Sequence, residues 1–460
     1  MRSPYFLSIF LGILCFIACT KRDEFTSDPA ARLEFSADSI LFDTVFTSTG
    51  SVTQRIKIFN LSDKAIRITQ IKLEGGSASN YQMNVNGVPA TTLTSVEING
   101  RDSLNLFVRV TINPNSEQLP FIVKDSITFL TNGNRQKVIL HAYGQNAHFL
   151  KDAVLTEDTV WDNKLPYVIY NTIRVNPDKV LTITKGSRVY FHKDSEMIIA
   201  GSLKVKGDLK DSVVFASDRL ERIYADESGQ WKGIRLLRSS TNNVINFALI
   251  KNAIIGIQVD SSSRNSNPKV LLVNTIIKNM ELAGLISNNS DISAFNNIIT
   301  NCGKYLVYAL NGGRYDFKQN TFVNYNFTFP RNTQSLYFSN GSQADATTYP
   351  MSIELVNNII WGNLQEELQM ERKGSTAFTQ IIKNNLIKTQ NKDLDQTNIL
   401  NADPLFKNQK SSNFLLIQGS PAINKGADLS SDPQFGTWLN RDLRGHLRLF
   451  PSDLGSYELL

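Results

Sequence analysis

The side chains that could perform acid–base or nucleophilic chemistry are scattered through this sequence rather than gathered in a motif. Hydrolysis of a glycosidic bond uses two carboxyl groups about 5–10 Å apart, but no two aspartates are adjacent in the chain. The best isolated titratable group is His192-Lys193-Asp194, whose composition suits an exposed corner. The sequence has no Cys/His metal spacing, no phosphate-binding loop and no Ser-His-Asp order. We therefore predict no catalytic residue, no metal site and no cofactor.

A binding function is easier to place, because binding residues concentrate in loops on a rigid scaffold. One long interval, Thr328 to Tyr349, interrupts a repeated pattern and contains Arg331, Tyr337 and Phe338, and Trp361 follows it. The flat faces of aromatic rings can stack on sugar rings. The alternative is that these side chains pack the interval against the scaffold. We predict that Arg331, Tyr337, Phe338 and Trp361 are the ligand-binding residues.

The scaffold is indicated by a short phrase, an asparagine followed after one residue by two apolar residues, which recurs through the second half. Successive copies are 22, 24, 37 and 27 residues apart, and a weaker first copy begins with phenylalanine. Recurrence at roughly 20–50 residues is typical of a stacked-coil protein. The copies are Phe247-Ala-Leu249-Ile250, Asn274-Thr-Ile276-Ile277, Asn296-Asn-Ile298-Ile299, Asn320-Thr-Phe322-Val323, Asn357-Asn-Ile359-Ile360 and Asn384-Asn-Leu386-Ile387.

Each copy of the phrase supplies one apolar pair and one bend to a coil. Stacked coils place the same residue type at the same inward position, and burial of one isoleucine contributes about 1.5–3 kcal/mol. Asparagine tolerates the left-handed backbone of a tight bend and can hydrogen-bond the asparagine of the next coil. In this register no carboxylate cluster falls on adjacent coils. Short runs separated by glycines suit the earlier coils, at 172–175, 180–183, 189–191, 197–199, 203–206 and 213–215.

The region from Leu33 to about Ala147 alternates apolar and polar residues with a period of two. This pattern predicts an antiparallel β-sandwich. Asn132-Gly133-Asn134 predicts a tight hairpin between strands near 126–131 and 138–144. His141 lies on the second of these strands, and we expect it to be packed rather than to bind a ligand.

The N-terminus has the features of a secretory signal. One basic residue, Arg2, precedes an apolar run of 14 residues that ends at Ala18, and this run is short for a membrane span of about 20 residues. Phe16-Ile17-Ala18-Cys19 resembles the lipobox of bacterial lipoproteins, which implies that Cys19 is lipidated and tethers the protein to a membrane. The alternative is an ordinary signal peptide that contains a cysteine. The charged stretch 20–24 is similar to signals that carry some Gram-negative lipoproteins to the cell surface.

The composition excludes several classes of function. Of the 460 residues 41 % are hydrophobic and 20 % charged, and the net charge is only +6. No block of five basic residues occurs, so we predict no nucleic-acid partner. The cysteines are Cys15, Cys19 and Cys302, so no internal disulfide framework is expected after processing. We expect a monomer.

Three sets of phrases resemble known families. Residues 181–234, with Gly186, Gly201, Gly207 and Gly233 between short apolar runs, look like the opening coils of right-handed parallel β-helix (pectin-lyase-like) proteins. The C-terminal phrases are similar to the closing signature of a choice-of-anchor domain: 402–406 (ADPLF), 419–426 (GSPAINKG) and 453–458 (DLGSYE). The phrases at 42–45, 58–60, 131–133 and 142–144 resemble ASH/MSP-type immunoglobulin-like domains, which are spacers and protein-binding modules.

These observations predict an all-β chain. It comprises a lipoprotein signal peptide (1–18), a tether (19–32), an immunoglobulin-like sandwich (33–148), a right-handed parallel β-helix (149–417) and a closing segment (418–460). We expect a lipid-anchored protein of the bacterial outer membrane, exposed at the surface or facing the periplasm, that is a non-catalytic adhesin-like or glycan-binding scaffold. The alternative is a lyase or hydrolase acting on an acidic polysaccharide. Three or more charged side chains converging beside 328–349 would favour the enzyme, and an aliphatic or asparagine-lined face would not.

Overall fold

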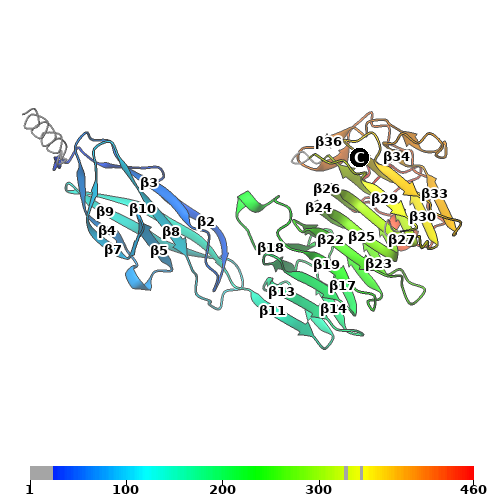
Figure 1. The fold of residues 1–460 in the computed structure, drawn as a ribbon, viewed down its shortest axis with the longest axis horizontal. Helices are drawn as coiled ribbons and strands as arrows, with labels where there is room; N and C mark the ends of the chain where they lie inside the picture. Colours follow the sequence, from blue (N-terminus) through cyan, green and yellow to red (C-terminus); the bar gives the residue numbers. More distant parts are fainter. Residues whose placement is uncertain (1–23, 326–329, 342–345, 460) are drawn as a thin grey trace, which may run out of the picture. The chain divides into compact units, whose positions relative to one another are not determined.

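The computed structural model describes residues 24–325, 330–341 and 346–459. It divides into two compact units, residues 1–146 and 147–460 (Figure 1). The predicted signal peptide and Cys19 lie outside the described residues. Almost every element is a strand, as predicted, and the exceptions are three single turns of helix: η1 (Gly76–Ala78), η2 (Arg222–Tyr224) and η3 (Phe435–Leu439).

The first unit is a β-sandwich of two five-stranded sheets, which confirms the prediction from the period-two pattern. In β4 (Ile66–Leu73) buried and accessible residues alternate, because one face of the sheet lies on the core. One sheet has the order β1 (Leu33–Phe35), β3 (Gln54–Asn60), β8 (Ser103–Val110), β5 (Tyr81–Val85) and β6 (Val88–Ala90). The other has the order β2 (Ser39–Phe46), β10 (Asn134–Gln145), β9 (Phe121–Thr131), β4 and β7 (Thr92–Ile98).

Local chemistry fixes the turns of the sandwich. The hairpin between β9 and β10 turns at Asn132 and Gly133, whose φ angles of 49° and 76° are those of a tight primed turn. The amide of Asn60 donates to the carbonyls of Lys64, Ile98 and Asn99, at 2.9, 3.1 and 2.9 Å. A buried asparagine at the end of β3 therefore joins two turns. The strand pairs are antiparallel except β2 with β10, which is parallel.

The second unit is a parallel β-helix whose strands stack into three sheets (Figure 1). Sheet A contains the first halves of β11 (His148–Leu155) and β13 (Tyr167–Val175), and then β15 (Arg188–Phe191), β18 (Val213–Ser217), β21 (Ala248–Lys251), β24 (Ile276–Met280), β26 (Ile298–Cys302), β28 (Thr321–Asn324), β31 (Ile359–Gly362), β34 (Leu386–Ile387) and β35 (Ile399–Leu400).

Sheets B and C complete each coil. Sheet B contains the second halves of β11 and β13, then β16 (Glu196–Ile199), β19 (Gly233–Leu236), β22 (Ile255–Asp260), the first halves of β25 (Ala283–Phe295) and β27 (Tyr305–Lys318), β29 (Leu336–Ser339) and β32 (Leu368–Glu371). Sheet C contains β12 (Thr159–Trp161), β14 (Val180–Thr184), β17 (Ser202–Lys206), β20 (Asn243–Asn246), β23 (Val270–Val273), the second halves of β25 and β27, β30 (Met351–Val356) and β33 (Phe378–Lys383).

The repeated phrase forms the inner column and the bend of sheet A. Six side chains in register line the core with no exposed surface: Ile250, Ile277, Ile299, Phe322, Ile360 and Ile387. The predicted register is wrong by one residue in one coil. Ile299 pairs with Phe322, so this copy begins at Gln319 rather than Asn320. Gln319 has a φ of 59°, the left-handed value that asparagine takes in the other copies.

The residue after the bend forms a buried asparagine ladder. In each step the side-chain amide of one asparagine donates to the side-chain oxygen of the next, at 2.9, 3.0, 2.9 and 3.0 Å. The ladder therefore satisfies its own polar groups inside the protein, which buried amides require. Its members are Asn297, Asn320, Asn358, Asn385 and Asn398.

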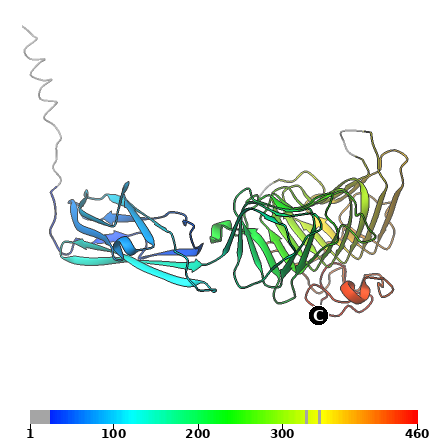
Figure 2. The ribbon, with the colours of Figure 1, turned by 90° about the horizontal axis from the view of Figure 1, so that it is seen from below.

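The chain beyond β35 packs over the outer face of the later coils of sheet A (Figure 2). It contains the short hairpin β36 (Phe406–Asn408) and β37 (Asn413–Leu416). Phe406, Phe414 and Leu416 pack with Ile298 and Ile359 of sheet A in one buried cluster. Both apolar residues of each phrase are therefore buried in these coils, one inside the helix and one beneath this closing segment.

Candidate ligand-binding surface

Two of the four predicted binding residues lie inside packed cores. Phe338 of β29 is 0 % exposed, and its ring meets Tyr315 edge-on at 5.3 Å between centroids. Trp361 of β31 is 7 % exposed in the cluster beneath the closing segment, with Lys388 Nζ 5.1 Å from its ring centroid. Neither ring offers an open face to a sugar, so the packing alternative describes both.

Arg331 also has a structural position. Its guanidinium pairs with Glu367 at 2.6 Å, and the two side chains are 3 % and 0 % exposed. Glu367 also accepts hydrogen bonds from the backbone N–H of Ser335 at 3.1 Å, its hydroxyl at 2.6 Å and the N–H of Leu364 at 2.8 Å. This pair joins the chain before β29 to the chain before β32.

The predicted excursion is not one continuous loop, because β29 returns to the coil. Leu336 to Phe338 pair in register with Val307 to Ala309 of β27, and the whole strand is buried. The extra residues of the 37-residue interval between Asn320 and Asn357 therefore lie before and after β29. The prediction that 328–349 forms a single loop is wrong for this strand.

Tyr337 points outward from β29 and belongs to a cluster of three tyrosines on sheet B. The ring of Tyr308, its register partner on β27, lies 5.4 Å from the Tyr337 ring between centroids. Tyr305 stacks on Tyr308 at 4.4 Å with an interplanar angle of 22°. Tyr305 and Tyr308 are partly exposed, whereas Tyr337 is 8 % exposed. This tyrosine cluster is the aromatic surface that the sequence located only through Tyr337.

The hydroxyls of the cluster are neutral hydrogen-bonding groups. Burial raises the pKa of Tyr305 and of Tyr308, so both remain protonated near neutral pH. Tyr337 donates its hydroxyl to Glu371 of β32, and this hydrogen bond lowers the pKa of the glutamate. The cluster therefore combines apolar ring faces with protonated hydroxyls and one carboxylate.

One outward residue per coil continues the cluster along sheet B. These register partners are Arg235, Gln258, Ile286, Tyr308, Tyr337 and Gln369. Adjacent parallel strands are about 4.8 Å apart, so the row presents a side chain at intervals comparable to the length of one sugar unit. Asp260 holds the start of the row, because it pairs with Arg235 at 3.2 Å and accepts from Gln258 at 3.1 Å.

Sheet C has a charged hollow of about 280 Å³ that the sequence register missed. Asp316 and Glu354 are register partners on β27 and β30, and both contact Lys318 Nζ, at 2.9 and 3.1 Å. The sequence register predicted no carboxylate cluster on adjacent coils and did not reveal this pair. The one-residue register error at Gln319 hid the pair. Asp316 lies six residues before the inward Phe322, and Glu354 lies six residues before the inward Ile360, so the two carboxylates align only in the observed register.

Two cations, Lys318 and Arg314, contact the carboxylates of this hollow. Burial raises the pKa of Asp316, although the attraction of Lys318 opposes this shift. Lys318 is itself buried and also contacts Asp432 of the closing segment at 2.7 Å. Arg314 pairs with Asp291 at 3.1 Å at the other side of the hollow. The lysine thus fastens the closing segment to sheet C and holds both carboxylates.

His192, which belongs to the titratable group singled out in the sequence, has a carboxylate partner. His192 Nδ1 lies 2.7 Å from Asp218 Oδ2, and the two side chains are 49 % and 10 % exposed. Burial raises the pKa of Asp218. No serine or cysteine side chain is bonded to this pair among the described residues, so it lacks the nucleophile of a hydrolytic triad.

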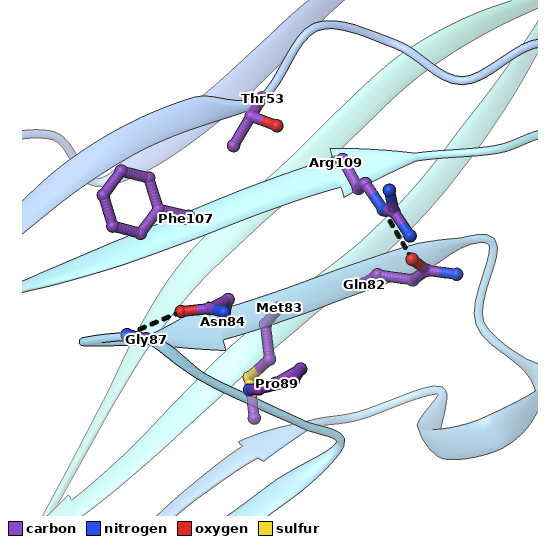
Figure 3. A pocket seen from close by; sticks show the side chains of 8 residues that line it. All are labelled: Thr53, Gln82, Met83, Asn84, Gly87, Pro89, Phe107 and Arg109. Carbon is purple, nitrogen blue, oxygen red and sulfur yellow. Dashed lines mark hydrogen bonds between the residues drawn. The ribbon is translucent and has the colours of Figure 1, made fainter.

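The sandwich has its own open hollow, on the outer side of β5 and β8 (Figure 3). Phe107, Pro89 and Met83 supply an apolar lining, and at one end Arg109 donates to Gln82 at 2.6 Å. The hollow contains no carboxylate or histidine, so it offers no acid–base chemistry.

Within the described ranges no group of three or more His, Cys, Asp and Glu side chains is arranged to hold a metal ion. Residues 24–325, 330–341 and 346–459 likewise include no helix of the length and apolarity that a membrane crossing requires. Cys302 is a buried thiol of β26 whose pKa burial raises to about 12.

Comparison with known proteins identifies the second unit. A family model described as a right-handed β-helix region matches residues 156–322. Together with the parallel pairing, this match confirms the predicted fold class of a sandwich followed by a right-handed parallel β-helix. No curated protein matches the chain.

Solved structures share only parts of the chain. A family 123 glycoside hydrolase from Clostridium perfringens is similar over 25 % of this chain and 26 % of its own, at 10 % identity and a TM-score of 0.18. A protein of unknown function from Porphyromonas gingivalis W83 is similar over 27 % of this chain and 60 % of its own, at 8 % identity and a TM-score of 0.19. The chain thus spans less than two thirds of either structure.

Proposed function

We propose that this protein binds a glycan without cleaving it, along the outer face of sheet B. The observation that carries the proposal is the tyrosine cluster of Tyr305, Tyr308 and Tyr337. The partly exposed rings of Tyr305 and Tyr308, with their hydroxyls, suit a sugar, which has an apolar face and many hydroxyls. The row of outward side chains on the neighbouring coils, which includes Arg235, Gln258 and Gln369, gives a linear glycan further contacts.

The proposal includes a lipid anchor at Cys19 on the bacterial outer membrane, with the mature protein a monomer on the cell surface. Its support is the apolar run before Cys19 and the charged residues that follow it. Replacement of Cys19 by alanine is expected to release the protein from the membrane. Membrane attachment of the variant, cut at the same place, would contradict the anchor.

The binding proposal is tested with the chain from residue 20 onward on a glycan array. The wild type is expected to retain at least one glycan, and Tyr305→Ala with Tyr308→Ala is expected to weaken binding about 10-fold or more, since stacked aromatic contacts contribute about 0.5–1.5 kcal/mol each beyond their buried area. Tyr143→Ala is the matched control, because Tyr143 is an exposed tyrosine of the sandwich. Equal loss in the control, or no glycan bound by the wild type, would remove the proposal.

A glycoside hydrolase is the second candidate, favoured by one observation. Asp316 and Glu354 are adjacent in register, and strands about 4.8 Å apart bring carboxyl groups within the range that hydrolases use. Asp316, with its raised pKa, would be the acid and Glu354 the nucleophile or base. Release of reducing ends by the wild type and its loss in Asp316→Asn would establish this function; activity unchanged in that variant would exclude this pair.

A further inference from the structure

A further pocket lies on sheet A, over β15, β18 and β21. The loop from Asp218 to Gln230, including η2, stands over the outer face of β15, β18 and β21 and encloses about 210 Å³. Tyr190, Val214, Ala216 and Leu249 form an apolar floor. The rest of the lining includes the polar or aromatic side chains of Arg219, Tyr224, Lys251 and Asn252.

The loop is held in place by hydrogen bonds from the coil. Asn252 Nδ2 donates to the carbonyls of Tyr224 and Ala225, at 3.0 and 3.1 Å. Gln230 Nε2 also donates to the Tyr224 carbonyl, at 2.9 Å. Asn252 has a φ of 70°, so the same bend residue that shapes the coil fastens the loop. The pocket is therefore formed before any ligand arrives.

Two polar groups of this pocket lack full partners. Asn252 is 2 % exposed, and its side-chain oxygen accepts no hydrogen bond from any described residue. A buried acceptor without a donor costs about 1–3 kcal/mol. The Asn252 side-chain oxygen therefore has no hydrogen-bond donor within the described part of the chain.

The second group is the ammonium of Lys251. It donates to the Ala225 carbonyl at 3.1 Å and has no carboxylate within ion-pair distance in the described ranges. Three acids of the loop have other partners: Asp218 contacts His192 at 2.7 Å, Glu221 pairs with Arg219 at 3.2 Å, and Asp226 pairs with Lys278 at 3.6 Å. Burial lowers the pKa of Lys251 and the nearby charge of Lys278 lowers it further, whereas Asp226 opposes this shift.

We propose that this pocket binds a small hydroxy-carboxylate of monosaccharide size, with its carboxylate on Lys251 and a hydroxyl donated to the Asn252 oxygen. The apolar side of the ligand lies on the Tyr190 floor, and Tyr224, stacked under Arg219 at 4.0 Å, forms one wall. The ligand is either the terminal acid of a glycan or a free hydroxy acid. The site lies on a different sheet from the tyrosine cluster, and neither proposal depends on the other.

The test is calorimetric titration of the chain from residue 20 onward with three probes: free glucuronate, a disaccharide ending in glucuronate, and glucose. Saturable binding of glucuronate is expected, with glucose binding at least tenfold weaker. A charge-assisted hydrogen bond contributes about 1.5–3 kcal/mol, so Lys251→Gln is expected to weaken glucuronate binding roughly 10- to 100-fold. Tighter binding of the disaccharide than of free glucuronate would identify a glycan end, and the reverse a free acid.

Two further variants separate binding from folding. Lys251→Arg keeps the charge and is expected to restore most of the affinity lost in Lys251→Gln. Lys206→Gln removes an exposed lysine of sheet C and is expected to bind as the wild type does. Equal binding by wild type and Lys251→Gln, equal binding of glucose and glucuronate, or no saturable binding of either acidic probe would overturn the proposal.

Discussion

Replacement of Asn320 by alanine is expected to destabilise the β-helix by about 3–5 kcal/mol. Asn320 lies inside the asparagine ladder with no exposed surface. Its side-chain oxygen accepts from the N–H and the amide of Asn297, both at 2.9 Å, and its amide donates to the Ala294 carbonyl at 2.8 Å. The substitution leaves two donors and one acceptor buried without partners, at about 1–3 kcal/mol each before relaxation.

The measurement is urea unfolding followed by tryptophan fluorescence. All four tryptophans, Trp161, Trp231, Trp361 and Trp438, belong to the second unit, so the signal reports the β-helix and not the sandwich. Asn398→Ala is the matched control, because Asn398 ends the ladder and is 8 % exposed, so water can replace some of its bonds. A loss below about 1 kcal/mol in Asn320→Ala, or an equal loss in both variants, would refute the idea that the ladder carries buried polar stability.

Three other perturbations follow from buried contacts. Arg331→Met leaves the Glu367 carboxylate buried without its cation, so it is expected to lower the free energy of unfolding in urea by about 3–5 kcal/mol. The double variant Arg331→Met with Glu367→Gln is expected to recover much of this lost stability. An equal loss in both variants would contradict the pairing. Gly455→Ala adds a Cβ 2.7 Å from Thr321 Oγ1 at a φ of 87°, so limited proteolysis is expected to cut the closing segment faster than in wild type, and unchanged cleavage would count against it. Cys302, whose pKa is about 12, is expected to resist a thiol reagent at pH 8 and to react fully in urea; fast labelling of the native protein would show that the thiol is accessible.

The fold could be predicted because its sequence patterns are regular and continue over many residues. Period-two alternation marks the sandwich, and Asn132-Gly133 marks its hairpin, because few residues adopt the left-handed backbone of that turn. The coil is visible because inward positions such as Ile277 and Ile299 repeat at nearly constant spacing. The register failed only at Gln319, where the bend residue is not asparagine. Pattern matching shifted there to the next asparagine, Asn320, which belongs to the inner ladder.

The candidate site was harder to predict, because exposure of a residue depends on what covers its face. Trp361 follows the repeat pattern of an outward residue, and only the distant closing segment buries it. Phe338 belongs to a strand that looked like part of a loop, since the step between bends was long. Tyr308 could have been found from strand alternation in β27, once β29 was known to pair beside it. These are relations between coils, and no single window of sequence contains them.

The two asparagines of the repeated phrase have different functions, and the difference restricts where a ligand can bind. The second asparagine builds the inner ladder, whereas the bend residue points outward to the closing segment. Asn296 donates to the carbonyls of Trp438 and Arg441 at 2.7 and 2.9 Å, and Asn357 donates to that of Ala427 at 3.0 Å. Gln319 keeps this contact by donating to Ser452 at 2.8 Å, which explains why glutamine is tolerated at that bend.

The closing signature is the other half of this contact. Arg448, with no exposed side-chain surface, pairs with Glu458 and donates to Asn296 at 2.9 Å, so the final phrase is bonded to a bend of the coil. Gly455 has no side chain to hold it away from Thr321. The C-terminal residues thus cover the later coils of sheet A. Because that cover occupies the later coils of sheet A, long ligands are restricted to sheets B and C there.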